Sequence, residues 1–248
     1  MDLLIEKWRG VALDGNFFKL EEDDLPESKC NTYAEFIKSE DFGKASSDFH
    51  LGLIPQPYIG NLASAKVFIL MLNPGFSPGD YYAQEHSATF KQARIANLEQ
   101  KNEADDYPFF YLNPEFAWTA GGQWWQSKLR SITNELVKKN QLSFREALRH
   151  ISQHLACLEL CPYFSKEYSK PKLPLVSIEA ARNYVQSTVA EKCQADDAIA
   201  VVTRQVKEWG LSKTKNVICL EASQARGAHL TMNTEAGNRI YQKLAESL

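Results

Sequence analysis

The chain has 248 residues, of which 44% are hydrophobic, and a formal net charge of -3. This length suits one α/β domain, with or without an N-terminal elaboration, and the apolar content excludes global disorder. The first ten residues carry charge too early for a signal peptide, and no apolar run reaches the roughly 18 residues that a membrane span requires. We therefore expect a soluble, cytoplasmic, monomeric protein without contact to a membrane.

The charge is distributed unevenly along the chain. Residues 1–50 hold 12 acidic and 6 basic residues, whereas residues 51–248 hold 19 acidic and 22 basic residues. We expect 1–50 to be an acidic elaboration packed on or flanking the core, and 51–248 to be the main domain. A mildly basic body is compatible with an enzyme that contacts a few phosphates.

Four short apolar runs are rich in β-branched residues, at positions 66–72, 155–161, 198–203 and 216–220. Their continuous apolarity indicates strands buried on both faces, as in a parallel sheet. Helical patterns lie between and after the runs, at about 124–139, after a capping box of Ser143 and Glu146, from Ser177 to Cys193, and at 203–209 and 234–248. This alternation predicts an α/β sandwich with helices on both faces of the sheet. Residues 84–107 are polar, and we expect part of them to form a loop.

The five cysteines form no Cys-x-x-Cys pair, and their odd number argues against a disulfide framework. Cys157 and Cys161 can be metal ligands in principle, but they sit in an apolar run that is typical of buried thiols. We expect neither a metal nor another cofactor.

The loop after the first run carries the first candidate site, because ligands of parallel α/β sheets bind at the carboxyl ends of the strands. It reads Asn73-Pro-Gly-Phe76-Ser77-Pro-Gly-Asp80. The Asn73 carboxamide can orient a water by accepting one hydrogen bond, but it cannot act as a strong base. Such a weak activator suits a leaving group that departs early, through an oxocarbenium-like state. Asp80 is a carboxylate that can assist or replace Asn73, and the alternative is a turn without chemistry.

Two further segments follow strands at the same end of the expected sheet. Tyr163 and Phe164 follow the second run, where they either line a pocket together with Phe76 or pack beneath the loop. The fourth run is followed by small residues around Arg226, which would let backbone amides approach a phosphate while the arginine projects. The alternative is a connector with a solvated arginine. Trp124 and Trp125 open a helix, with Trp125 expected in the core and Trp124 partly exposed.

Together these motifs resemble the uracil-DNA glycosylase superfamily, nearest its mismatch-specific uracil/thymine branch. Residues 67–79 resemble a Gly-Ile-Asn-Pro-Gly-like first motif, Trp124-Trp125 a Phe-Trp helix, and residues 223–228 a Ser-x-Ala-Arg-x-Ala second motif. The resemblance implies a central four-stranded parallel sheet in which the runs lie in the order 2-1-3-4, flanked by helices. It also implies hydrolysis of the N-glycosidic bond of a base flipped out of DNA. That base would be uracil or a mismatched or modified pyrimidine, removed in DNA repair or in defence against modified phage DNA.

The resemblance assigns roles by position. Asn73 would position the water, Phe76 would stack on the flipped base, and Arg226 would fill the hole left in the duplex. From their place at the same end of the sheet, Tyr163 and Phe164 are expected to join Phe76 in the base pocket. The expected DNA contacts are Ser77, Ser223, Gln224 and Arg226.

Departures from the family pattern leave the identity of the base open. Glu221 and Ala222 precede the second-motif serine where a Pro-Ser is usual, and residues 160–165 differ from the base-reading segments of the uracil enzymes. The four-cysteine cluster of some branches is absent, so no iron–sulfur centre is expected. Two alternatives remain: a catalytically silent nucleic-acid-binding member, and an unrelated α/β hydrolase acting on small molecules. The chain has no phosphate-binding Gly-x-x-x-x-Gly-Lys loop and no Gly-x-Ser-x-Gly elbow.

The wedge role of Arg226 leads to a first prediction. Filling the hole offsets the few kcal/mol that unstacking costs, and a single strand has no hole to fill. Arg226→Ala is therefore expected to slow base release from duplex DNA much more than from single strands, measured under single-turnover conditions at fixed salt. Equal loss on both substrates would leave Arg226 as a backbone contact.

Overall fold

The computed structural model describes residues 3–13, 15, 17–26, 29–171, 174–221, 228 and 230–248. Its centre is a five-stranded sheet in the order β1-β3-β2-β4-β5. The strands are β1 (Tyr58–Ile59), β2 (Val67–Met71), β3 (Leu155–Glu159), β4 (Ile199–Val202) and β5 (Val217–Cys219). β2 pairs in parallel with β3 and β4, and β4 pairs in parallel with β5, whereas β1 is antiparallel to β3. The expected α/β class is confirmed, but the sheet is mixed and five-stranded rather than four-stranded and wholly parallel.

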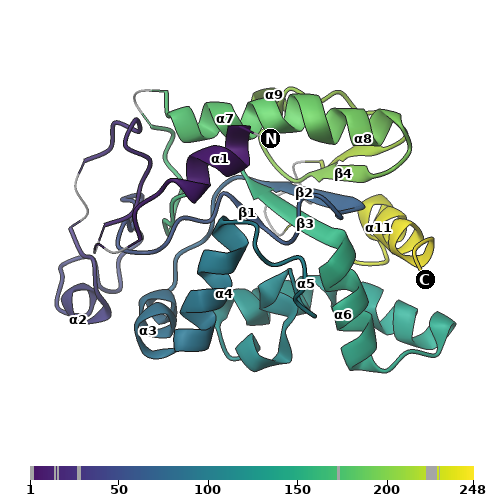
Figure 1. Cartoon of the computed structure of the whole chain (residues 1–248), viewed down its shortest axis with the longest axis horizontal. Helices are drawn as coiled ribbons and strands as arrows, with labels where there is room; N and C mark the ends of the chain where they lie inside the picture. Colours follow the sequence, from purple (N-terminus) through teal and green to yellow (C-terminus); the bar gives the residue numbers. More distant parts are fainter. Residues whose placement is uncertain are drawn as a thin grey trace.

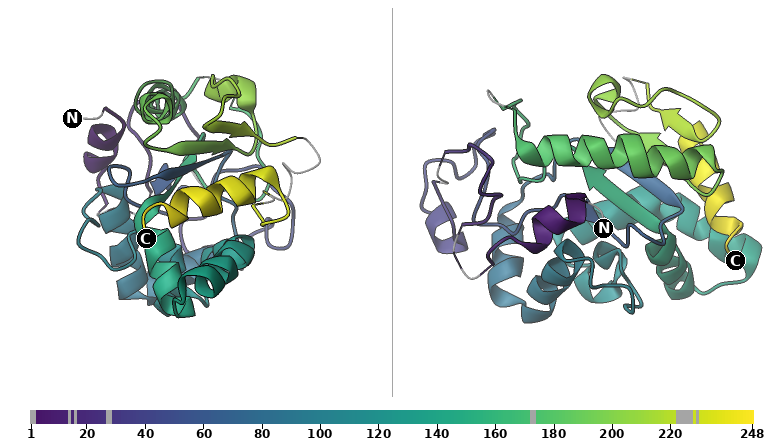
Figure 2. Two further views of the ribbon diagram at one scale, coloured as in Figure 1. Left: turned by 90° about the vertical axis from the view of Figure 1, so that its right-hand side faces the viewer. Right: turned by 45° about the horizontal axis from the view of Figure 1, so that its top comes forward.

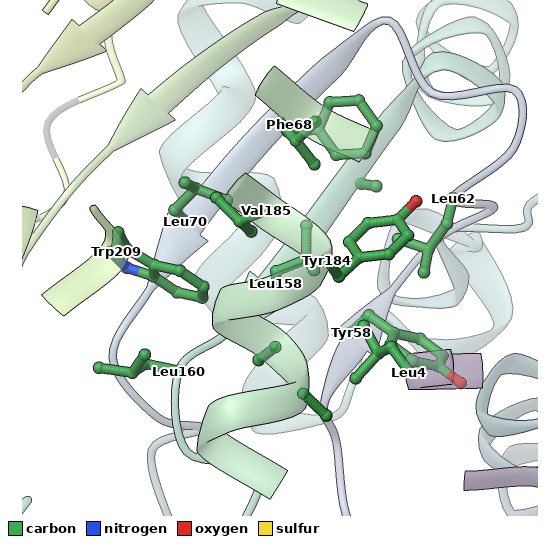
Figure 3. Close-up of a cluster of buried hydrophobic side chains, with 14 of the residues drawn as sticks. Leu4, Tyr58, Leu62, Phe68, Leu70, Leu158, Leu160, Tyr184, Val185 and Trp209 are labelled. Carbon is green, nitrogen blue, oxygen red and sulfur yellow. The ribbon is translucent and has the colours of Figure 1, made fainter. Parts of the chain in front are cut away.

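Helices cover both faces of this sheet (Figures 1 and 2). One face packs against α1 (Leu3–Arg9), α7 (Val176–Tyr184), a π-helical stretch (Val185–Val189) and α8 (Ala190–Gln194). Figure 3 shows Phe68, Leu70 and Leu158 of this face against Tyr184 and Val185. The other face packs against α5 (Ala120–Asn140), α6 (Phe144–His154) and α11 (Glu235–Ala245). Burial on both faces explains why the strands read as continuous apolar runs.

The antiparallel edge strand β1 is held by side-chain amides instead of a further strand. Asn97 and Gln100 belong to or follow α4 (Ala88–Leu98). Asn97 Nδ2 donates to the Tyr58 carbonyl at 2.8 Å, and its Oδ1 accepts from the Gly60 N–H at 2.9 Å. Gln100 accepts from the Leu62 N–H at 2.8 Å and donates to the Gly60 carbonyl at 2.9 Å. These bonds satisfy backbone groups that an exposed edge would otherwise leave open.

The expectation that part of residues 84–107 forms a loop is confirmed for residues 99–107, which belong to no helix or strand. The rest of this segment is mainly the end of α3 (Pro78–His86) and all of α4, and some of its polar side chains are buried. Gln84, for example, donates to the Gly52 carbonyl and accepts from the Ile54 N–H, both at 2.8 Å. Part of the polarity of residues 84–107 therefore reflects buried hydrogen bonding rather than solvent exposure.

Local capping explains where several helices begin. Ser143 Oγ accepts from the Glu146 N–H at 3.2 Å while the Glu146 carboxylate accepts from the Ser143 N–H at 2.7 Å, so the predicted capping box at α6 is confirmed. The helix expected from Ser177 instead begins at Val176.

The remaining helical elements within the described residues are α2 (Tyr33–Phe36), α9 (Val206–Trp209) and two short 3₁₀ turns, Phe110–Leu112 and Pro114–Phe116. Among the described residues, no helix has the length and apolarity needed to cross a lipid bilayer.

The acidic N-terminal segment shares the hydrophobic core with the rest of the chain. Trp8 of α1 is buried there. Further along, the buried Asp23 accepts a hydrogen bond from the Tyr163 hydroxyl at 2.5 Å and another from the Ser177 N–H in the first turn of α7 at 3.1 Å. The same hydroxyl accepts from the Leu20 N–H at 3.1 Å. One buried tyrosine thus connects the N-terminal segment, the loop after β3 and the start of α7.

Removal of that hydroxyl is expected to destabilise the protein. Tyr163→Phe leaves a buried carboxylate and a buried N–H each without one partner, which costs about 1–3 kcal/mol of unfolding free energy. Urea denaturation measures this loss, and Tyr241→Phe on α11, a partly exposed tyrosine, is the matched control. An unchanged midpoint for Tyr163→Phe would show that the hydrogen bonds to Asp23 and Leu20 contribute nothing net.

Candidate functional site

A cavity of about 280 Å³ lies at the carboxyl ends of β2 and β3, on the face of the sheet that packs against α5. This is the place where ligands of open α/β sheets bind. The walls combine aromatic rings with a few polar groups, as small-molecule sites do. The lining residues are Gln56, Met71, Asn73, Pro74, Gly75, Phe76, Ser77, Asp80, Tyr111, Ala120, Gly121, Trp124, Trp125, Glu159 and Phe164.

The loop that carries Asn73 is fixed to the loop after β3 by backbone hydrogen bonds. Beyond the last paired residues of the two strands, the Cys161 N–H donates to the Leu72 carbonyl at 2.9 Å. Further on, the Ser165 N–H donates to the Pro74 carbonyl at 3.3 Å, and the Phe76 N–H donates to the Ser165 carbonyl at 3.1 Å. The parallel pairing of β2 with β3 is thereby resumed in the loops, as a bridge between Gly75 and Ser165.

The Asn73 side chain is oriented by two hydrogen bonds. Its Nδ2 donates to the Pro74 carbonyl at 3.1 Å and to Ser165 Oγ at 2.9 Å. A carbonyl oxygen can only accept, so the amide nitrogen must lie on this side. With both N–H groups used in this way, Oδ1 is the polar atom of this half-buried, cavity-lining side chain that is left to accept a hydrogen bond from a ligand.

Two aromatic rings of the cavity are supported from behind. Phe76 stacks on His50 with ring centroids 3.5 Å apart and an interplanar angle of 17°. Burial lowers the pKa of His50 to about 4, so this imidazole is neutral at pH 7. The Arg94 guanidinium lies 4.8 Å from the Phe164 ring centroid, in cation–π geometry. These contacts hold the two rings in place without a ligand.

Asp80 is buried and caps α3. Its Oδ2 accepts from the Ser77 N–H at 2.7 Å, which orders the end of the Asn73 loop. Burial raises the pKa of Asp80 to about 6, and the hydrogen bond from Ser77 and the charge of Arg94 oppose this rise. The carboxyl group therefore has a structural role at the cavity wall.

Glu159 is an ionisable cavity residue that the sequence patterns did not predict. It is the last residue of β3, 3% exposed, and burial raises its pKa to about 8. The Cys157 thiol donates to its Oε1 at 3.8 Å, whereas Oε2 is buried without a hydrogen-bond partner. A single acid at the carboxyl end of an otherwise apolar run was the signal that could have identified it.

The first turn of α5 closes the cavity on another side. Ala120 and Gly121 line it, so the N-terminus of this 21-residue helix, the positive end of its dipole, borders the cavity. A Cβ atom on Gly121 would lie 2.3 Å from the Tyr111 ring, so only glycine lets that ring approach. The Tyr111 hydroxyl donates to Gln56 Oε1 at 3.0 Å.

The two tryptophans next to this turn lie as expected. Trp125 is 4% exposed and Trp124 is 36% exposed, with their rings in edge-to-face contact.

The cavity brings together five of the predicted site residues: Asn73, Phe76, Ser77, Asp80 and Phe164. Tyr163 is not one of its lining residues. Its ring packs against Trp8 and its hydroxyl donates to Asp23. Tyr163 therefore packs beneath the loop, which was the alternative to a pocket role. Successive residues of an extended chain point in opposite directions, which separates Tyr163 from Phe164. The predicted DNA contacts Ser223, Gln224 and Arg226 lie outside the described residues.

Comparisons of the chain with protein-family models, with curated proteins and with solved structures gave no match.

The buried Glu159 carboxyl predicts a pH dependence of stability. Its pKa is raised from 4.5 to about 8, so the folded state keeps a proton that the unfolded state has lost, and stability falls as pH rises through this range. Between pH 6.5 and 8 the contribution of Glu159 to the pH dependence is separated from that of His50. The pKa of His50 is lowered from 6.5, so His50 titrates below this window.

In that window the unfolding free energy of the wild type is expected to fall by about 1 kcal/mol per pH unit. Glu159→Gln is expected to lose most of this slope, because glutamine does not titrate. Urea titrations at the two ends of the window measure the slope. Glu179→Gln, an exposed glutamate on α7, is the matched control. An identical slope in Glu159→Gln and the wild type would mean that Glu159 is ionised in the folded protein.

Proposed function

We propose that the chain is a DNA glycosylase that hydrolyses the N-glycosidic bond of a pyrimidine base flipped out of DNA, with Asn73 positioning the attacking water. The observation that carries this proposal is the oriented Asn73 amide at the wall of a small cavity lined by aromatic rings. The parallel succession β3-β2-β4-β5 supports it, because it corresponds to the 2-1-3-4 order of the uracil-DNA glycosylase superfamily that the motifs resemble. The edge strand β1 would then be an addition to that arrangement.

The size of the cavity limits what can react there. Its volume of about 280 Å³ is at the lower end of ligand pockets and fits one base rather than a segment of duplex. A base can enter only after it has left the stack. In our proposal the base then stacks on one face of the Phe76 ring, and the imidazole of His50, stacked on the other face, keeps that ring in position.

The chemistry follows from what Asn73 can and cannot do. Its Oδ1 accepts a hydrogen bond from a water and thereby directs a lone pair of that water toward C1′. The bond from C1′ to the base breaks with its electron pair moving onto the base, and the water oxygen bonds to the electron-poor C1′. The positive end of α5 stabilises the negative charge that develops on the departing base. The reaction consumes only water and therefore requires no cofactor.

Exposed aromatic residues offer a surface for the DNA around the extruded base. Trp124 lines the cavity and is also exposed, and the Lys128 ammonium lies 5.3 Å from its ring centroid. Trp118, which precedes α5, is 49% exposed. Exposed rings beside a cation suit the stacking and phosphate contacts that bind nucleic acid.

Replacement of the amide is expected to separate catalysis from binding. Asn73→Ala should slow single-turnover base release by ~100-fold or more, because a water misplaced by about 1 Å costs that much. DNA affinity should stay within about 3-fold, since the amide acts mainly in the transition state. Ser165→Ala, which removes one of the two bonds that orient Asn73, should give a smaller loss, whereas Asn183→Ala on the exposed side of α7 should give none. Wild-type turnover of Asn73→Ala would remove Asn73 from the mechanism.

A further inference from the structure

The Glu159 carboxyl is the buried acid of the cavity that the proposed hydrolysis does not use. It is paired in register with Met71, two residues before Asn73. Paired residues of neighbouring parallel strands point to the same face, so Glu159 lies with Met71 on the α5 side of the sheet, and Asn73 is in the loop that follows β2. Glu159 and Asn73 both line the cavity. A base that stacks on Phe76 would therefore lie within the space that the two side chains border.

The surroundings of Glu159 leave part of its hydrogen-bonding capacity for a ligand. Oε2 is buried without a partner, which is costly in a protein interior. The groups that act on the carboxyl electrostatically are Arg204, the Cys157 and Cys161 thiols and the Tyr111 hydroxyl, and Asp80 lies across the same cavity. Among the salt bridges between described residues, none involves Glu159. A neutral carboxyl group in this position presents one donor and one acceptor.

We propose that Glu159 reads the pairing edge of a pyrimidine with a 4-amino group and donates its proton to N3 of that base as the glycosidic bond breaks. The inference rests on the proposed glycosylase function and names its substrate class: cytosine and its modified forms. The carboxyl oxygen accepts from the 4-amino group while the carboxyl O–H donates to N3, which is a bidentate match.

The 4-amino group is preferred because it suits both protonation states of the acid. The ionised carboxylate still accepts from the amino group, whereas it repels the 4-oxo oxygen of uracil, which is itself an acceptor. A neutral carboxyl could bind either base. Discrimination against uracil therefore increases as Glu159 becomes ionised.

The proton transfer also assists departure of the base. The bond between C1′ and N1 breaks, its electron pair stays on the base, and the Glu159 proton moves to N3, so the cytosine leaves neutral. The water oxygen bonds to C1′, one of its protons is released to solvent, and Glu159 regains a proton from solvent. The sum is the consumption of one water and the formation of a free base and an abasic deoxyribose. Uracil has a hydrogen on N3 and cannot accept a proton there.

The test uses the full chain and oligonucleotides with one target base, cytosine, 5-hydroxymethylcytosine or uracil, in a strand without other cytosines. Base release is followed under single-turnover conditions for the wild type, Glu159→Gln and the control Glu179→Gln. Glutamine keeps one donor and one acceptor but cannot transfer a proton. We expect Glu159→Gln to slow release of at least one 4-amino pyrimidine by ~100-fold, the lower range for a lost general acid, with KM within about 3-fold. Release of uracil should change by less than about 3-fold, and Glu179→Gln should change neither.

The pH profile supplies a readout that a structural role would not move. Release of the 4-amino base by the wild type should decline above about pH 8, where Glu159 ionises, and Glu159→Gln should lack this decline. Equal slowing on uracil and on the 4-amino bases, or faster release of uracil than of both 4-amino bases by the wild type, would overturn the inference while the proposed function stood.

Absence of base release from every oligonucleotide would instead overturn the proposed function. In that case the recognition of the pairing edge by Glu159 is tested separately, by measuring the binding of deoxycytidine monophosphate and deoxyuridine monophosphate in a thermal-shift assay. A preference of the wild type for the cytidine nucleotide that Glu159→Leu abolishes would retain Glu159 as the reader of the base. Equal binding of the two nucleotides would overturn that role as well.

Discussion

The candidate site depends on the pairing of β2 with β3, which continues beyond the sheet into the loops that follow. Backbone hydrogen bonds from Cys161 to Leu72 and between Ser165 and the Asn73 loop hold two chain segments in register, although they are about 90 residues apart in sequence. Because the backbone is fixed, the Asn73 amide can be oriented by Ser165 Oγ. Catalytic groups that are held before the substrate arrives avoid the cost of reorganisation during the reaction.

Buried polar groups have two different roles in this molecule. The amides of Asn97 and Gln100 satisfy backbone groups of β1 and of the residues that follow it at the sheet edge. Glu159, in contrast, has a carboxyl oxygen without a partner and a raised pKa, so it lowers stability near neutral pH. A group that is costly in the free protein and that lines a cavity is what a binding site retains for its ligand. Glu159 and the oriented Asn73 line the same small cavity.

The sequence predicted those features whose signal is local. The four buried runs, the capping box at Ser143 and the Asn73 loop at a strand end depend on short patterns, and the structure has them. β1 is only two residues long, and its pairing relies on amides some 40 residues away, so no local pattern marks it. That Phe164 lines the cavity whereas Tyr163 packs beneath the loop could not be predicted without knowing which side of the chain faces the cavity. Glu159 was hidden because hydrophobic periodicity treats a buried acid as part of the strand.

The central claim is that the cavity between β2, β3 and α5 receives a base from DNA. The most direct measurement is a crystal structure of the protein with a duplex whose target nucleotide carries 2′-fluorine, which slows cleavage by destabilising the oxocarbenium-like state. Our account predicts an extruded base in the cavity, with its ring on Phe76 and Asn73 Oδ1 beside C1′. A target base that remains stacked in the duplex, or that binds elsewhere on the protein, would contradict it.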